Sequence, residues 1–271
     1  MVAETSARMP VVYVSHGAPD VLLKAPDTVA CWREIGQRLP EPKAILVVSA
    51  HWEARVATVS LTGVPATIHD FAGFAPVLKR MGYPAPGAPA LAERVAALLA
   101  GAGIAADLHP NRGLDHGAWV PLSAMYPKAQ LPVTQLSLTR QGPAAHLELG
   151  QALAPLRDEG VLILASGAIT HNFDWLDWSA KGDEPPMPRA LTFADWVGER
   201  LATGNSSALL DYRRAPYGAE SHPSEEHIMP LFVALAAAGG DAPVRYRPRF
   251  TYGALAMDTY VWSDGQRCPA A

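Results

Sequence analysis

The stretch Val161-Leu-Ile-Leu-Ala-Ser-Gly-Ala-Ile-Thr-His171 joins a continuous apolar run to small residues and then to a histidine. Two other runs share this plan, Val11-Val-Tyr-Val-Ser-His16 and Ala44-Ile-Leu-Val-Val-Ser-Ala-His51. A short run that is apolar throughout is typical of a strand with helices on both of its faces. The three runs therefore predict buried strands at 11–14, 44–49 and 161–165, each with a histidine just past its end.

Further β-branched runs alternate along the chain with segments whose apolar residues recur at helical spacing. The additional strands are expected at 56–61, 133–138, 244–250 and 255–262. Covering helices are expected at 90–100, 144–156, 190–201 and 225–238. This alternation predicts a single α/β domain over residues 1–271, a three-layer α/β/α sandwich around a mostly parallel or mixed sheet.

Composition excludes several classes of protein. Hydrophobic residues make up 49% of the 271 residues and charged residues 18%, which is enough apolar material for a core and argues against a disordered chain. The formal charge of -4 offers no broad basic surface, so we expect neither nucleic acid nor an anionic membrane as a partner. Two cysteines, Cys31 and Cys268, are too few for a disulfide framework. The first residues lack the pattern of a secretory signal, and a cytoplasmic location is expected.

The histidines that follow the strands can share a ligand. In open α/β sheets, ligands bind in the crevice beyond the carboxyl ends of the strands, so His16, His51 and His171 can reach one point. Neutral imidazole is the commonest metal-binding side chain. A single histidine after a strand is more often a cap or a satisfied polar group. Three histidines with the same placement favour a metal site.

Two other segments carry candidate histidines. In the first, His222-Pro-Ser-Glu-Glu-His227, Ser224 is expected to cap a helix whose first turn holds His227. Either His227 or His222 can be the residue that reaches inward. In the second, His116 follows Asp115 in a turn-rich stretch before an apolar helix, where the carboxylate can cap the helix or orient a ring.

Seven short runs, spread over nearly the whole chain, carry a family resemblance through their order and spacing. They are Ser15-His-Gly-Ala-Pro19, Ser49-Ala-His-Trp52, Ile68-His-Asp-Phe71, Tyr83-Pro-Ala-Pro-Gly87, Arg112-Gly-Leu-Asp-His-Gly117, Ser166-Gly-Ala-Ile-Thr-His-Asn172 and His222-Pro-Ser-Glu-Glu-His227. Together they resemble the DOPA 4,5-dioxygenase-like group of class III extradiol ring-cleavage dioxygenases. In that family a non-haem Fe(II) opens a catechol ring next to its two hydroxyls, and both atoms of O2 enter the product.

The resemblance implies roles for individual histidines. His16 and His51 match metal ligands, and His227 matches the third. His171 matches a histidine that either acts as an acid/base beside the metal or closes the coordination shell when zinc occupies the site. His116 matches a position that lines the substrate pocket and handles protons.

The third ligand departs from the common pattern of non-haem iron enzymes, in which two histidines and a carboxylate hold the metal. His227 stands where the carboxylate is usual, and Glu225 or Glu226 is the alternative if the match is shifted by a residue or two. His222 is the other histidine that can fill this place. Further candidates for substrate binding are Ser15, Asp115 and His222.

The sequence thus predicts an Fe(II)-dependent extradiol dioxygenase acting on a small aromatic diol and O2, with Zn(II) as a metal that can occupy the same site. Two alternatives stay open: a zinc-dependent hydrolase that uses the same histidines to activate water, and a non-catalytic binding protein on the same fold. The loops 68–74 and 175–188 are expected to shape the pocket. The aromatic residues available to stack on a ring are Trp52, Phe71, Phe173, Trp175 and Tyr252.

Overall fold

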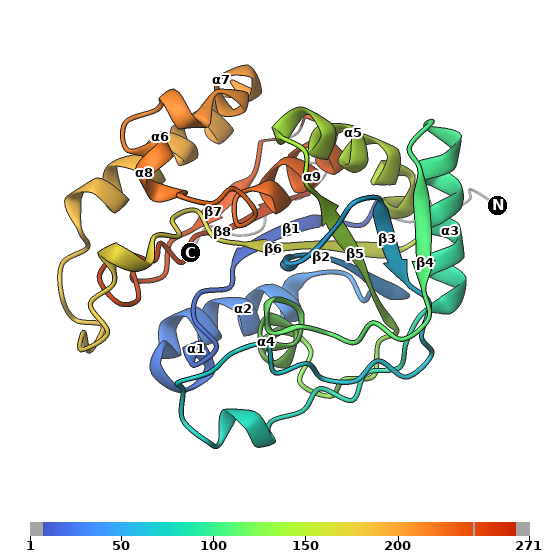
Figure 1. Ribbon diagram of the computed structural model, residues 1–271, viewed down its shortest axis with the longest axis horizontal. Helices are drawn as coiled ribbons and strands as arrows, with labels where there is room; N and C mark the ends of the chain where they lie inside the picture. The colour runs from blue at the N-terminus through green and yellow to red at the C-terminus, as the bar shows by residue number, and fades with distance from the viewer. Residues whose placement is uncertain (1–7, 241, 264–271) are drawn as a thin grey trace.

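A single mixed sheet organises the computed structural model, which describes residues 8–240 and 242–263 (Figure 1). The strands are β1 (Val11–Ser15), β2 (Ala44–Ala54), β3 (Ala57–Ser60), β4 (Ala106–His109), β5 (Val133–Thr139), β6 (Val161–Gly167), β7 (Val244–Tyr246) and β8 (Thr259–Trp262). Their order across the sheet is β4-β3-β5-β2-β6-β1-β8-β7. The central strands β5, β2, β6 and β1 run parallel, whereas β8 pairs antiparallel with β1 and β3 pairs antiparallel with β5.

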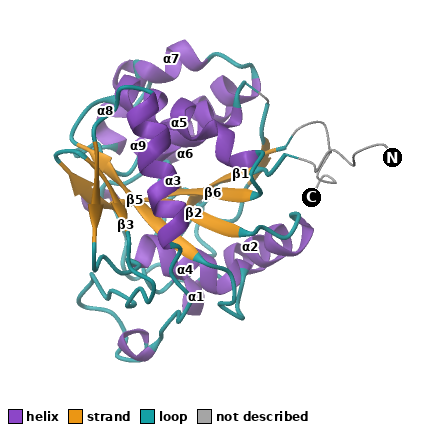
Figure 2. Cartoon of the chain, turned by 90° about the vertical axis from the view of Figure 1, so that its right-hand side faces the viewer, coloured by secondary structure: helices purple, strands orange, loops and turns teal. Residues whose placement is uncertain are grey.

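Helices cover both faces of the sheet. They are α1 (Val21–Lys24), α2 (Pro26–Arg38), α3 (Pro89–Gly101), α4 (His116–Met125), α5 (Pro143–Leu153), α6 (Pro188–Ala202), α7 (Ser206–Leu210), α8 (Gly218–Ser221) and α9 (Met229–Ala238). Figure 1 shows α1, α2 and α4 on one side of the sheet and α5, α6 and α9 on the other, and the view turned by 90° shows the same layers (Figure 2). The predicted three-layer α/β/α sandwich is confirmed.

The side-chain alternation of a strand explains the two layers. In β1, Val12 and Val14 belong to the apolar cluster formed with α1, α2 and α4, whereas Val11 and Tyr13 belong to the cluster formed with α3, α5, α6 and α9. All four side chains are completely buried. A strand that is apolar on both faces therefore has a helix layer to fill on each side.

Three sequence expectations need correction. The helix expected at 225–238 begins at Met229, because Pro230 suits the first turn of a helix, while Ser224 donates to Glu226 Oε1 instead of capping. His51 lies within β2, which runs on to Ala54 through an irregularity in its pairing with β5. The last two strands are shorter than expected: β7 covers only the first residues of the strand expected at 244–250, and β8 only the last residues of the strand expected at 255–262.

Several elements lay outside the sequence expectations, among them β4 and α2. The edge strand β4 has mostly exposed side chains, so no apolar run marks it. Helix α2 buries Thr28, Trp32 and Ile35 at helical spacing behind an initial Pro26, a signal that could have identified it. Among the described residues, no helix has both the length and the apolar character to cross a membrane. Cys268 lies outside the described residues.

The close contact between α5 and α9, in the helix layer that covers one face of the sheet, leads to a prediction about stability. A Cβ added at Gly150 in α5 would lie 2.2 Å from the carbonyl oxygen of Val233 in α9. We expect Gly150→Ala to lower the free energy of unfolding by about 1–3 kcal/mol, because the helices must separate. In α3, a Cβ at Gly101 would meet nothing within 4 Å. The matched variant Gly101→Ala should therefore be neutral or stabilising by up to about 1 kcal/mol. Urea unfolding compares the two, and equal effects would contradict this packing account.

Candidate metal centre

Five histidines face one cavity of about 330 Å³. They are His16, His51, His116, His171 and His227. The other lining residues are Gly17, Ala18, Pro19, Asp70, Phe71, Ala72, Phe74, Phe173, Leu176, Trp178 and Leu255. The cavity is thus polar on the histidine side and largely apolar elsewhere, which is typical of a site that binds and orients a small molecule.

Adjacent strands bring three of these histidines together. β2, β6 and β1 are neighbours in the sheet and run parallel, so their carboxyl ends meet at one edge. His16 follows β1 and donates its backbone N–H to the carbonyl oxygen of Gly167 at the end of β6, at 2.9 Å. His51 stands in the irregular part of β2, and His171 follows β6 after a short turn. The sequence prediction that these strands converge is consistent with this arrangement.

His227 reaches the same cavity from the segment between α8 and α9. Its carbonyl oxygen accepts the backbone N–H of Ala168 at 2.8 Å, which fixes the segment beside β6. A Cβ at Gly167 would lie 2.1 Å from that oxygen, so the approach requires glycine. His227 is 4% exposed, and its ring centroid lies 5.4 Å from that of His16 and 5.0 Å from that of His51.

Hydrogen bonds set the tautomers of two of these rings. Ser166 Oγ donates to the carbonyl oxygen of Gly117, so it accepts from His16 Nδ1 at 2.9 Å. His227 Nδ1 lies 2.8 Å from the carboxylate oxygen Oε1 of Glu226. In each ring the proton is therefore on Nδ1, and the lone pair is on Nε2. Partners of this kind orient metal-binding histidines and raise their basicity.

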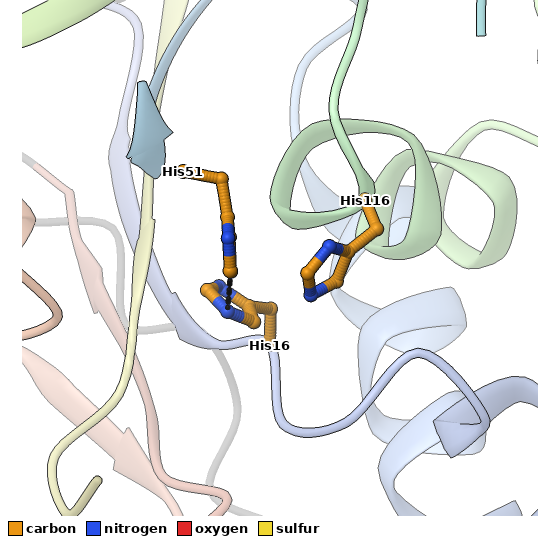
Figure 3. A group of neighbouring side chains, drawn as sticks. All are labelled: His16, His51 and His116. Carbon is orange, nitrogen blue, oxygen red and sulfur yellow. Dashed lines mark hydrogen bonds between the residues drawn. The ribbon is translucent and has the colours of Figure 1, made fainter. Parts of the chain in front are cut away.

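The Nε2 lone pairs face into the cavity. His16 Nε2 lies 3.0 Å from His51 Nε2, as the dashed line in Figure 3 shows. His227 Nε2 is buried and has no hydrogen-bond partner among the described residues. Burial, reinforced by the neighbouring imidazoles, holds the pKa of His16 and of His227 well below the usual value. These rings are neutral near pH 7 and can bind a metal ion.

Asp70, one of the residues that line the cavity, connects two of the histidines. Its carboxylate lies 2.9 Å from His116 Nδ1 and 3.4 Å from His51 Nδ1, and it also accepts the backbone N–H of His116 at 3.0 Å. Burial alone would raise the pKa of Asp70, but the close contact with the His116 ring, the backbone N–H of His116 and the neighbouring His51 outweigh it and lower the pKa to about 2. The residue is therefore ionised and orients both rings. It stands in the run Ile68-His-Asp-Phe71, but sequence analysis gave it no role.

The ligand atoms fall into two compact groups. In one, the ligand atoms of His16, His51 and His116 lie within 4.8 Å of one another, and Figure 3 shows these three rings facing a common space. In the other group, the ligand atoms of His171, Glu226 and His227 also lie within 4.8 Å of one another. His171 stacks on His227 with centroids 3.4 Å apart and ring planes 7° apart. Burial lowers the pKa of His171 to about 4, against the opposing charge of Glu226.

The three residues predicted to touch substrate lie behind the cavity wall. Ser15 Oγ accepts the backbone N–H of Ile169, and His222 Nε2 bonds the carbonyl oxygen of that residue at 2.8 Å. Asp115 is completely buried and accepts hydrogen bonds from Ser49, Arg112 and Gln135. Each of them supports the residues around the cavity, and none is among its described lining residues.

The two loops expected to shape the pocket do contribute to its wall. The loop 68–74 supplies Phe71 and Phe74, and the loop 175–188 supplies Leu176 and Trp178, while Phe173 lies just before the second loop. Of the aromatic residues proposed from sequence to stack on a ring, Phe71 and Phe173 line this cavity. Trp178, which sequence analysis missed, is half-exposed at the rim.

Known proteins resemble this chain over most of its length. Residues 6–258 match the family model of the catalytic LigB subunit of aromatic ring-opening dioxygenase. A 4,5-DOPA dioxygenase extradiol of Escherichia coli (strain K12) is 41% identical over 244 residues, covering 89% of each chain. The protein of that name from Beta vulgaris is 43% identical over 235 residues, covering 84% of this chain and 86% of its own. The crystal structure of an uncharacterized protein from Escherichia coli K12 superposes with a TM-score of 0.77 at 35% identity, covering 94% of this chain and 99% of that one.

The position of Asp70 generates a prediction for metal affinity. We expect Asp70→Asn to weaken binding of a divalent metal by about 10–100-fold, because the amide carries no charge and offers only one acceptor oxygen, so the ring of His51 is held less firmly. Competition with a chelator measures the change. Asp107→Asn, at an exposed position on β4, is the matched control and should bind as the unaltered protein does. Unchanged affinity in Asp70→Asn would contradict the orienting role.

Proposed function

Because this chain belongs to the family of the catalytic LigB subunit of aromatic ring-opening dioxygenases, and is therefore an extradiol ring-cleavage dioxygenase, we propose that it uses Fe(II) and O2 to open the ring of a DOPA-like catechol. The observation that carries the proposal is the convergence of neutral imidazole nitrogens on one cavity with apolar walls. We propose further that residues 1–271 act as one catalytic domain, since both helix layers pack on the sheet that bears the histidines.

The donor set fits such a metal ion. With its proton on Nδ1, His16 presents a lone pair at Nε2, and His51 Nε2 stands 3.0 Å away. His51 Nδ1 points to the carboxylate of Asp70, so the proton of this ring also belongs on the outer nitrogen. Two lone pairs that face each other are stabilised by a cation, and imidazole suits both iron and zinc.

We assign the third ligand position to His227 in preference to His116. His227 Nε2 is buried without a hydrogen-bond partner, a costly state that a metal ion would relieve. His116 instead forms a dyad with the ionised Asp70 at the start of α4. A carboxylate behind an imidazole stabilises the ring once it has accepted a proton. His116 is therefore suited to proton transfer, in agreement with the role that the family resemblance implies.

The chain's own residues bind and prepare the substrate. His116 can take the proton of a catechol hydroxyl at Nε2, and the charge of Asp70 stabilises the imidazolium that results. His171 is neutral near pH 7 and faces the same space, so it can accept or return a second proton. The half-buried side chains of Phe71, Phe74 and Leu176 line the cavity and would exclude water from part of the ring. Bound Fe(II) would hold the diol and O2 together and pass electrons between them.

Metal-dependent turnover tests the proposed reaction. The protein is purified without oxygen, loaded with Fe(II) or Zn(II), and mixed with DOPA in air. We expect a yellow ring-opened product and oxygen uptake with Fe(II), and neither with Zn(II), because zinc has no redox chemistry. Hydrolysis of esters or amides by the zinc form, without catechol cleavage by the iron form, would favour a zinc hydrolase instead.

Single replacements separate metal ligands from proton-transfer residues. We expect His16→Ala, His51→Ala and His227→Ala to lose bound metal and activity together. His116→Ala and His171→Ala should keep most of the metal and lose about 10²–10⁴-fold in turnover, the usual contribution of a general acid or base. Metal analysis of the purified variants gives the comparison. If His116→Ala loses the metal and His227→Ala keeps it, His116 is the metal ligand and His227 the proton-transfer residue.

A further inference from the structure

A second cavity of about 360 Å³ adjoins the histidine cavity. Its walls are Ala18, Asp20, Val21, Lys24, Trp178, Ser179, Ala180, Lys181, Gly182, Thr251 and Tyr252. Ala18 and Trp178 line both cavities. The two spaces therefore meet at these side chains, and we call the second one the side cavity.

Two further segments connect the cavities. Residues 16–19 line the histidine cavity, and the same stretch continues through Asp20 to Lys24 along the side cavity. In the turn 251–255, Leu255 faces the histidine cavity and Tyr252 the side cavity. Two backbone hydrogen bonds of 3.0 Å between Thr251 and Leu255 close this turn. Tyr252 has φ +51°, a left-handed conformation that is strained for a residue other than glycine. Such strain is often found at binding sites.

The side cavity carries a net positive charge. Lys24 Nζ lies 3.0 Å from Asp20 Oδ2 and donates to Tyr252 Oη at 3.1 Å, while Tyr252 Oη donates to the same carboxylate oxygen at 2.5 Å. These contacts use two of the three ammonium protons of Lys24, and its side chain is 57% exposed. Lys181 adds a second positive charge to the wall. With two lysines and one aspartate, the charged lining residues favour an anion.

We propose that the side cavity binds the carboxylate of an acidic side chain on the catechol ring, with Lys24 as the residue that determines this specificity. The inference rests on the proposed function, because it places the ring hydroxyls among the histidines. The substituent then passes between Ala18 and Trp178. The indole ring of Trp178 lies 4.8 Å from the ring of Tyr252 and forms the wall along this path. The side cavity would thus hold the carboxylate that a DOPA-like catechol carries on its short side chain.

Equilibrium binding to the Zn(II)-loaded protein tests the assignment without turnover. The probes are dihydrocaffeate and 4-ethylcatechol, which share the ring and a two-carbon chain but differ in the carboxylate. We expect dihydrocaffeate to bind about tenfold more tightly, as a charged hydrogen bond allows. Lys24→Met should abolish this difference and leave 4-ethylcatechol unchanged, which also shows that the variant is folded. Lys24→Arg should restore it, and Lys128→Met, at an exposed position, should behave as the unaltered protein.

The results distinguish failure of the carboxylate site from failure of the proposed ring-opening reaction. If Lys24→Met leaves the preference for dihydrocaffeate intact, or weakens both ligands equally, the side cavity is not the carboxylate site. If neither catechol binds, the assignment also falls. Turnover of the Fe(II)-loaded protein is measured in parallel. Should the Lys24-dependent preference hold while no ring opens, the carboxylate site stands and the proposed reaction fails.

Discussion

Buried imidazole nitrogens that face one another are the constraint on which this site depends. His16 and His51 direct Nε2 atoms at each other across 3.0 Å, and His227 Nε2 is buried without a partner. Protonation would relieve the repulsion of the lone pairs, but it would place charge in a desolvated space, which is why burial depresses the pKa values of these rings. A divalent cation satisfies several lone pairs at once. The outer acceptors Ser166 and Glu226 keep the inner nitrogens unprotonated.

The order of strands in the mixed sheet brings the histidines together without long ordered loops. β2, β6 and β1 are hydrogen-bonded neighbours, so each delivers a residue to the same edge without a long loop. The irregular pairing of β2 with β5 begins after Val48, and His51 stands within it. Bulges of this kind re-aim a side chain next to active sites. Gly167 then allows the segment of His227 to lie against the end of β6, so a residue far along the chain completes the set.

Much of the fold was predictable, because its signals are local. The runs that form β1, β2 and β6 are apolar on both faces, and each face is filled by a helix layer. β4 was not predictable in this way, since an exposed edge strand has no apolar run. The start of α9 was misplaced because Ser224 resembles a cap, whereas Pro230 sets the first turn. The function itself was suggested by several runs in a particular order, which no single strand signal supplies.

The histidines that gather in the cavity could be named from sequence, but their partners could not. Asp70 approaches His51 and His116 from a loop without periodic pattern, so only the tertiary structure reveals the contact. Asp20 and Tyr252 are separated by 232 positions and still share a hydrogen bond. Neither residue belongs to a motif with a chemical signature. Contacts between distant loops depend on how the sheet brings their anchors together, and a sequence pattern does not encode that distance.

The histidines and the residues of the cavity walls lie on different parts of the fold. The histidines stand on or beside strands and helix starts that are buried, so their geometry is held by the core. The walls that would contact a ring substituent come mostly from the segments 70–74, 173–182 and 251–255, and α1 adds Val21 and Lys24. Loops accept changes that a core does not. A fixed histidine cluster beside adjustable walls can therefore keep one reaction while the shape and charge of its substrate change.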